Sequence, residues 1–202
     1  MATTNGYCSL ADVKAALRIT DSVDDALIEI SIDAASREVD GYCNRVFYKT
    51  TATRIYFPQD SFVTQTDDIV SITTLKTSLD GVAYGQTWTA ADYQLEPLNG
   101  VAGGLESPAT RVRAVGAFLF PLWSLSGTFG NFAPVQITGV FGWNAIPAAV
   151  KQATLILAMR QFKRYDSPLG VAGFGDLGAV RVGRVDPDVE ALLAPYRKSV
   201  SS

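Results

Sequence analysis

The fold is decided by residues 147–197, PAAVKQATLILAMRQFKRYDSPLGVAGFGDLGAVRVGRVDPDVEALLAPYR. This stretch contains the pattern of a long amphipathic helix, a glycine-rich segment and a short helix. Pro147 suits the first helical position, where a backbone N–H has no partner inside the helix. The basic residues Arg160, Lys163 and Arg164 fall in the last turns, where the helix dipole favours positive charge. Apolar residues recur along the helix and predict a wide buried face: Val150, Ala153, Leu155, Leu157, Ala158, Met159 and Phe162.

Ser167-Pro168 ends this helix, because the residue before proline avoids the helical region of backbone space. Five glycines then lie between 170 and 183, and Asp186-Pro187 can cap and open one further short helix. We therefore expect a packed helix within residues 144–167 and a docking arm over residues 168–202. The expected hinge residues of this arm are Pro168, Gly170, Gly173 and Gly175.

Residues 1–50 predict two helices. Ser9 and Asp12 form a capping-box pattern that starts a short helix ending near Arg18. Asp24 and Asp25 fall in the first turn of the next helix, where negative charge is favoured. The apolar stripe of that helix is Ile28, Ile32, Ala35, Val39, Tyr42 and Val46.

Residues 51–143 change to the period of two that is typical of strands. Runs rich in β-branched and aromatic residues occupy 53–57, 69–75, 93–96, 111–115 and 135–140, with turn residues between them. They predict an antiparallel sheet of five to seven short strands, either a sandwich or a barrel. The fold class is therefore α+β: a helical bundle with an inserted β-rich unit and a flexible C-terminal arm.

The segment Ala114–Leu125 (AVGAFLFPLWSL) is unusually apolar, but its length and its proline exclude a membrane span. It is either a buried strand followed by a loop or an exposed apolar tip that packs on another subunit, and burial is the favoured interpretation.

Composition excludes several classes of function. The 202 residues are 48% hydrophobic and 18% charged, with no histidine, so the commonest general base and nearly all catalytic zinc sites are missing. We expect no enzyme activity, no cofactor and no metal. The start MATTNGYCSL lacks a secretory signal, which favours buried free thiols for Cys8 and Cys43.

Three further patterns are better explained by structure than by chemistry. Residues 173–178 match G-x-G-x-x-G but follow a helix instead of a strand, so nucleotide binding is disfavoured. Asp24 and Asp25 suit a helix start, and Asp67 and Asp68 are expected in a turn before a strand.

The net charge of −3 is unevenly distributed. Residues 1–150 hold 9 Lys/Arg against 15 Asp/Glu, whereas residues 151–202 hold 8 against 5. A positive tail on a negative body suits docking to an acidic partner surface, although an incidental distribution explains the counts equally well. The tail cations could also follow a DNA backbone, but helix-dipole and protein contacts are favoured.

Several strings, in this order, resemble the head-to-tail adaptor (connector, or head completion) proteins of tailed bacteriophages. They are Tyr7–Lys14 with the helix Asp24–Asn44, Gly142-Trp143 before Pro147, Lys151-Gln152-Ala153, Arg164–Gly170, and Leu192-Leu193 to Arg197. These helical parts cover about half of the chain, and the β-rich insertion is not shared by the smaller members.

The resemblance implies a structural virion subunit. Such proteins form a ring, usually of twelve copies, between the portal protein and the stopper or tail-completion protein. The ring extends the channel through which genomic DNA passes without sequence-specific binding. The implied location is the head-tail interface of the virion, with assembly in the host cytoplasm and no membrane partner.

In this family the C-terminal segment commonly reaches the portal. Here that role would fall to the arm 170–185 and the helix 186–194. The resemblance implies apolar anchors at Leu192, Leu193 and Tyr196, and polar contacts at Arg181, Arg184 and Arg197.

Two other functions compete with this interpretation. Another neck or tail-completion protein would differ in ring size and partner. A β-rich module for a small molecule or glycan could use Trp88, Trp123 and Trp143 as binding platforms, provided that their rings are exposed.

Overall fold

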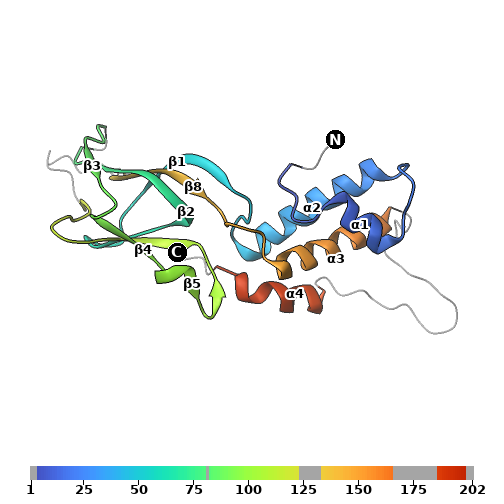
Figure 1. Ribbon diagram of the computed structural model, residues 1–202. Coiled ribbons are helices and arrows are strands. Elements are labelled where there is room, and N and C mark those ends of the chain that lie inside the picture. The colour runs from blue at the N-terminus through green and yellow to red at the C-terminus, as the bar shows by residue number, and fades with distance from the viewer. Residues whose placement is uncertain (1–3, 81, 123–132, 166–185, 199–202) are drawn as a thin grey trace. The chain divides into compact units, whose positions relative to one another are not determined.

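The computed structural model describes residues 4–80, 82–122, 133–165 and 186–198 (Figure 1). Contacts divide the chain into a helical unit, residues 1–47 with 146–202, and a β unit, residues 48–145. The expected α+β class is confirmed, with helices from both ends of the chain and an antiparallel sheet inserted between them.

The helical unit begins with α1 (Leu10–Leu17), which starts at the predicted capping box. The Ser9 hydroxyl accepts the Asp12 N–H at 3.1 Å, and the Asp12 carboxylate accepts the Ser9 N–H at 2.9 Å. Arg18 adopts a left-handed conformation (φ 59°) and ends the helix where the sequence predicted. α2 (Asp25–Cys43) also ends in a left-handed residue, Asn44 (φ 51°).

The helix α2 packs along α3 (Ala148–Arg164), as Figure 1 shows. The buried residues of α2 are Ile28, Ser31, Ile32, Ala35, Ser36, Val39 and Cys43, and those of α3 are Val150, Ala153, Thr154, Leu157 and Ala158. The predicted face of α3 was too wide, because Leu155, Met159 and Phe162 lie on the other side of the helix and are only half-buried. Val46 lies beyond the end of α2.

The short helix α4 (Pro187–Leu193) is followed by the 3-10 turn η2 (Ala194–Tyr196). It packs on α3 and also contacts α2. Its two buried residues, Val189 and Leu193, form its apolar face. Most of the expected docking arm, up to residue 185, lies outside the described residues.

The β unit contains one main antiparallel sheet in the order β1-β8-β2-β7-β4, with β3 paired to β2. The strands are β1 (Thr50–Tyr56), β2 (Val63–Thr77), β3 (Gln86–Trp88), β4 (Tyr93–Glu96), β7 (Ala109–Ala114) and β8 (Val135–Phe141). A 3-10 turn, η1 (Leu98–Gly100), precedes a small separate hairpin of β5 (Val101–Ala102) and β6 (Leu105–Glu106).

The fifteen-residue strand β2 joins both halves of this sheet. Its first part pairs with β7 and its second part with β8, and the register shifts between Gln65 and Ile69. A bulge of this kind bends a strand. Asp67 and Asp68 lie inside β2, so the predicted turn at these residues is wrong. Tertiary partners hold both carboxylates in the strand: Arg54 pairs with Asp67 at 2.7 Å, and the Trp143 N–H donates to Asp68 at 3.0 Å.

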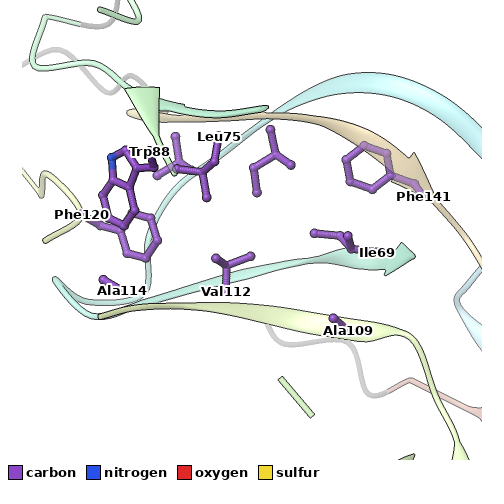
Figure 2. Close-up of a cluster of buried hydrophobic side chains, with 10 residues drawn as sticks. Ile69, Leu75, Trp88, Ala109, Val112, Ala114, Phe120 and Phe141 are labelled. Atoms are coloured by element: carbon purple, nitrogen blue, oxygen red, sulfur yellow. The ribbon is translucent and has the colours of Figure 1, made fainter. Parts of the chain in front are cut away.

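The β unit encloses its own apolar core (Figure 2). Val112 of β7 points toward the side chains of β2 and β8, and the Trp88 and Phe120 rings stack at one end, 4.7 Å apart at 11°. The favoured burial of Ala114–Leu125 therefore holds for Ala114 and Phe120. Leu119 and Leu122 remain exposed, and residues 123–125 lie outside the described residues.

Candidate docking site around the C-terminal helix

The start of α4 is fixed by a single carboxylate. Asp186 is the N-cap: its Oδ1 accepts the Asp188 N–H at 3.0 Å, and Pro187 occupies the first turn. Its other oxygen pairs with the Arg160 guanidinium of α3 at 3.1 Å. The same side chain therefore starts α4 and ties it to α3.

The body of α4 is held by an apolar face with polar edges. Val189 and Leu193 are 4% and 1% exposed. At the edges, the Tyr42 hydroxyl donates to Glu190 at 3.4 Å, and Gln161 of α3 donates to Glu38 of α2 at 2.9 Å. These side chains line one groove between α2, α3 and α4.

The residues after α4 also contact their own helical unit. The Tyr196 ring meets the Phe47 ring edge-on, with centroids 6.1 Å apart. The Arg197 guanidinium lies 5.6 Å from the centre of the Tyr42 ring, and the Lys198 N–H donates to the Cys43 carbonyl at 2.8 Å. The C-terminal segment is thus docked along the end of α2.

The structure therefore places the predicted docking residues in two groups. Leu193, Tyr196 and Arg197 contact their own chain, and Leu192 beside them is half-buried. The remaining predicted residues lie outside the described residues: Arg181, Arg184, Pro168, Gly170, Gly173 and Gly175. Their role at a partner stays a prediction. A short amphipathic helix has the same sequence pattern whether its apolar face meets its own chain or another, so sequence alone could not identify the groove.

A buried polar cluster fixes the N-terminal segment beside this site. The Tyr7 hydroxyl donates to the Asp40 carboxylate and accepts the Phe47 N–H at 2.9 Å. Burial raises the pKa of Tyr7 and of Asp40 above their ordinary values. Burial also raises the pKa of both Cys8 and Cys43 to about 11, so these buried free thiols stay protonated and unreactive at neutral pH.

The described residues form no group of three His, Cys, Asp or Glu side chains that could hold a metal ion. Trp88 and Trp143 are 3% and 5% exposed, so neither ring can serve as a glycan platform, and Trp123 lies outside the described residues. None of the helices in the described segments has the length and apolar composition needed to cross a membrane.

Sequence reasoning missed a second set of apolar residues on α2. Leu27 and Ile30 are 38% and 55% exposed, and Val23 just before the helix is 86% exposed. Their spacing of three to four residues was a helical signal in its own right.

Fold and site together define an α+β protein in which a β unit is inserted in the chain between the helices, and α2 and α3 dock the C-terminal helix. Residues 7–78, which are 72 of the 202 residues, match the phage gp6-like head-tail connector protein family. This match covers α1, α2, β1 and β2 and confirms the resemblance to phage head-to-tail adaptor proteins. No curated protein sequence matches the chain.

Solved structures share the fold over the whole chain. A chain in the neck of a native gene transfer agent (GTA) particle, computed with C12 symmetry, is 16% identical with a TM-score of 0.57; the match covers 100% of this chain and 94% of that one. A chain in the neck of an empty GTA particle, computed with C6 symmetry, is 19% identical with a TM-score of 0.56 and coverages of 100% and 95%. A chain of the native GTA virion is 20% identical, with the same TM-score and coverages.

Proposed function

We propose that this chain is a structural, non-enzymatic subunit of a virion neck: the adaptor ring between the portal and the stopper or tail-completion protein. The observation that carries the proposal is the fold match over 100% of the chain to chains of GTA necks. The connector-family match over residues 7–78 supports the same role independently of the fold. The subunit assembles in the host cytoplasm and remains at the head-tail interface.

The proposed ring contains twelve copies and extends the DNA channel. Support for a ring comes from the C6 and C12 symmetries of the neck structures that share this fold. A DNA conduit should not bind its cargo tightly, and phosphate contacts from Lys and Arg are the main source of non-specific affinity. The excess of acidic residues over residues 1–150 is compatible with DNA that slides past without sequence-specific contacts.

The arm that leads into α4 is the proposed portal contact. Arg181 and Arg184 would supply its polar contacts. Leu193 is buried within its own helical unit, so Leu193 and Tyr196 can reach a portal only if α4 leaves its groove. We therefore assign the first contact to the arm cations, with Leu192 and Arg197 beside them.

The test is the native mass of the full chain, measured alone and with a purified portal ring of the same virion. We expect a complex of ring size in the mixture, with a mass that fits twelve copies. A chain that never associates with the portal at any salt concentration would contradict the proposal.

The portal contact is tested separately with the variant Arg181→Glu/Arg184→Glu. Deleting residues 180–202 would also remove α4 and open the helical unit, so the charge reversal is the cleaner variant. Its matched control is Arg18→Glu/Lys76→Glu, two charge reversals outside the arm. We expect at least a tenfold loss of portal affinity in the arm variant and little change in the control. Equal losses would contradict the assignment to the arm.

A further inference from the structure

The helix α2 is apolar on two opposite faces. One face carries the buried residues that pack on α3. On the other face lie Leu27, Ile30, Ala34 and Gly41, which are all exposed and fall within an arc of about 60° at 100° per residue. We call these four residues the α2 outer stripe. A solvent-facing helix surface is usually polar, so an apolar stripe of this length suggests a partner.

The neighbours of α2 in the helical unit contact other parts of its circumference. Tyr7 of the N-terminal segment and Lys14 of α1 bond to Asp40 and Asp25 on one side. α4 and α3 meet Tyr42 and Glu38 on the other side. A Cβ added at Gly41 would meet no atom within 4 Å, so this part of the stripe is open.

A second apolar face lies on α3. Leu155, Met159 and Phe162 are half-buried and lie opposite the α3 residues that pack on α2. We call these three residues the α3 outer face. α1 and α4 bond to α3 through Lys151 and Arg160, which lie outside this set. Because α2 and α3 pack against each other, their two outer surfaces point in opposite directions.

We infer that the α2 outer stripe of one copy packs on the α3 outer face of the next copy, which gives the head-to-tail contact of the ring. This inference rests on the proposed function. A closed ring of identical subunits needs two different surfaces on each copy, and the helical unit presents two such surfaces on opposite sides. Ala34 and Gly41 would allow the incoming helix to approach closely.

Charge favours this pairing over one in which like faces meet. The exposed charged residues beside the α2 outer stripe are Asp33, Arg37 and Glu38. Arg37 is paired with Asp40 of its own helix at 2.9 Å, so the edge of the stripe is acidic on balance. Exposed Lys163 flanks the α3 outer face. Contact between two α2 stripes would bring acidic side chains together, whereas α2 against α3 brings opposite charges together. A pairing of unlike faces also repeats from copy to copy, whereas a pairing of like faces stops at a dimer.

The direct test is disulfide cross-linking of the full-length double variant Ile30→Cys/Met159→Cys, alone and with a purified portal ring. The two positions lie on outward faces of different helices, so a bond should form only between copies. After oxidation we expect a ladder of dimers, trimers and higher species on a denaturing gel. The matched controls are the two single variants, which should each stay monomeric because Cys8 and Cys43 are buried. Dimers of the Ile30→Cys variant alone would show contact between like faces and overturn the inference.

A second variant covers the case in which the cysteine variants fold poorly. Ile30→Asp should reduce the fraction of chain in ring-sized species at least tenfold while circular dichroism shows an unchanged helix content. Val82→Asp, at an 85% exposed apolar position in the β unit, is the matched control and should assemble normally. Rings that form without the cross-link ladder, or that tolerate Ile30→Asp, would overturn this interface and leave the neck role intact. A chain that forms no ring with or without the portal would overturn both.

Discussion

At the scale of single residues, Gly142 occupies a position of the fold that has no room for a side chain. Its φ is +105°, and a Cβ there would lie 2.0 Å from the Tyr48 carbonyl oxygen. We expect Gly142→Ala to lower the free energy of unfolding by more than about 2 kcal/mol, from strain and steric overlap together. Urea denaturation measures this loss.

The matched control is Gly116→Ala, because Gly116 also has a positive φ, +69°, but has no atom within 4 Å of the added Cβ. It should lose only the conformational term, about 1 kcal/mol. Equal losses of unfolding free energy at the two glycines would mean that the close approach of Tyr48 to Gly142 does not contribute to the destabilisation.

The residue after Gly142, Trp143, supplies a buried hydrogen bond. Its indole N–H donates to the Asp68 carboxylate at 3.0 Å, whereas the Trp88 N–H donates to the neutral Thr77 hydroxyl at 3.1 Å. Bonds to charged groups contribute more than bonds to neutral groups. Both substitutions also remove part of a buried ring, so the hydrogen bonds decide the difference between them: Trp143→Phe should destabilise the β unit by about 1 kcal/mol more than Trp88→Phe. The urea midpoints of the two variants test this order, and a reversed order would contradict it.

At the scale of single elements, the start of α1 links a predicted motif to pH dependence. Hydrogen bonds from the Ser9 hydroxyl and N–H, and then the contact with Lys151, lower the pKa of Asp12 from 3.8 to about 2. Because the folded pKa is the lower one, the ionised carboxylate stabilises the fold above pH 4, and this contribution disappears as the pH falls from 4 to 2.

Asp12→Asn should therefore flatten the stability profile in that window, relative to the unaltered chain. Ser9→Ala should remove about 1 kcal/mol at neutral pH through loss of the cap. Unfolding free energies measured from pH 5 to pH 2 check both expectations. If the unfolding free energy of the Asp12→Asn variant fell between pH 4 and pH 2 as steeply as that of the unaltered chain, the acid sensitivity would not come from Asp12.

The helix α4 allows a comparison of two adjacent leucines. Leu193 is 1% exposed in the groove, whereas Leu192 is half-buried. Leu193→Ala should cost about 2–5 kcal/mol and expose α4 to protease, whereas Leu192→Ala should cost about 1 kcal/mol or less. Thermal unfolding and limited proteolysis distinguish them. If Leu193→Ala left α4 protected, the groove would not be its main anchor.

The elements also show what the sequence could and could not predict. Local signals in the sequence predicted the starts of α1 and α4 correctly, because the capping side chains of Ser9 and Asp186 form hydrogen bonds to backbone groups only a few residues away. The start of β2 was missed, since Asp67 and Asp68 are stabilised there by Arg54 and Trp143, which are distant in sequence. The docking groove was missed for the same reason: the residues of α2 and α3 that meet α4 are far from it along the chain.

At the scale of the whole molecule, the β unit is an insertion whose two ends meet. The Lys49 ammonium donates to the Asn144 side chain at 2.8 Å, and β1 pairs with β8 from Thr50↔Phe141 onward. The apolar core of this unit comes from its own strands and the Phe120 segment. Each unit therefore has the contacts of an independent folding domain.

We expect the fragment 48–145 to fold alone, with the circular dichroism of a β protein and a single cooperative unfolding transition. The complementary chain, in which a short Gly/Ser linker replaces residues 48–145, should keep its helix content because the insertion begins and ends at adjacent points. The control is Leu193→Ala in that shortened chain, which should destabilise it by as much as in the full chain. An unfolded fragment, or a shortened chain without helix, would mean that the two units depend on contacts with each other. In that case the helical unit could not be studied without the β unit, and the proposed ring contact of α2 with α3 could be tested only in the full-length chain.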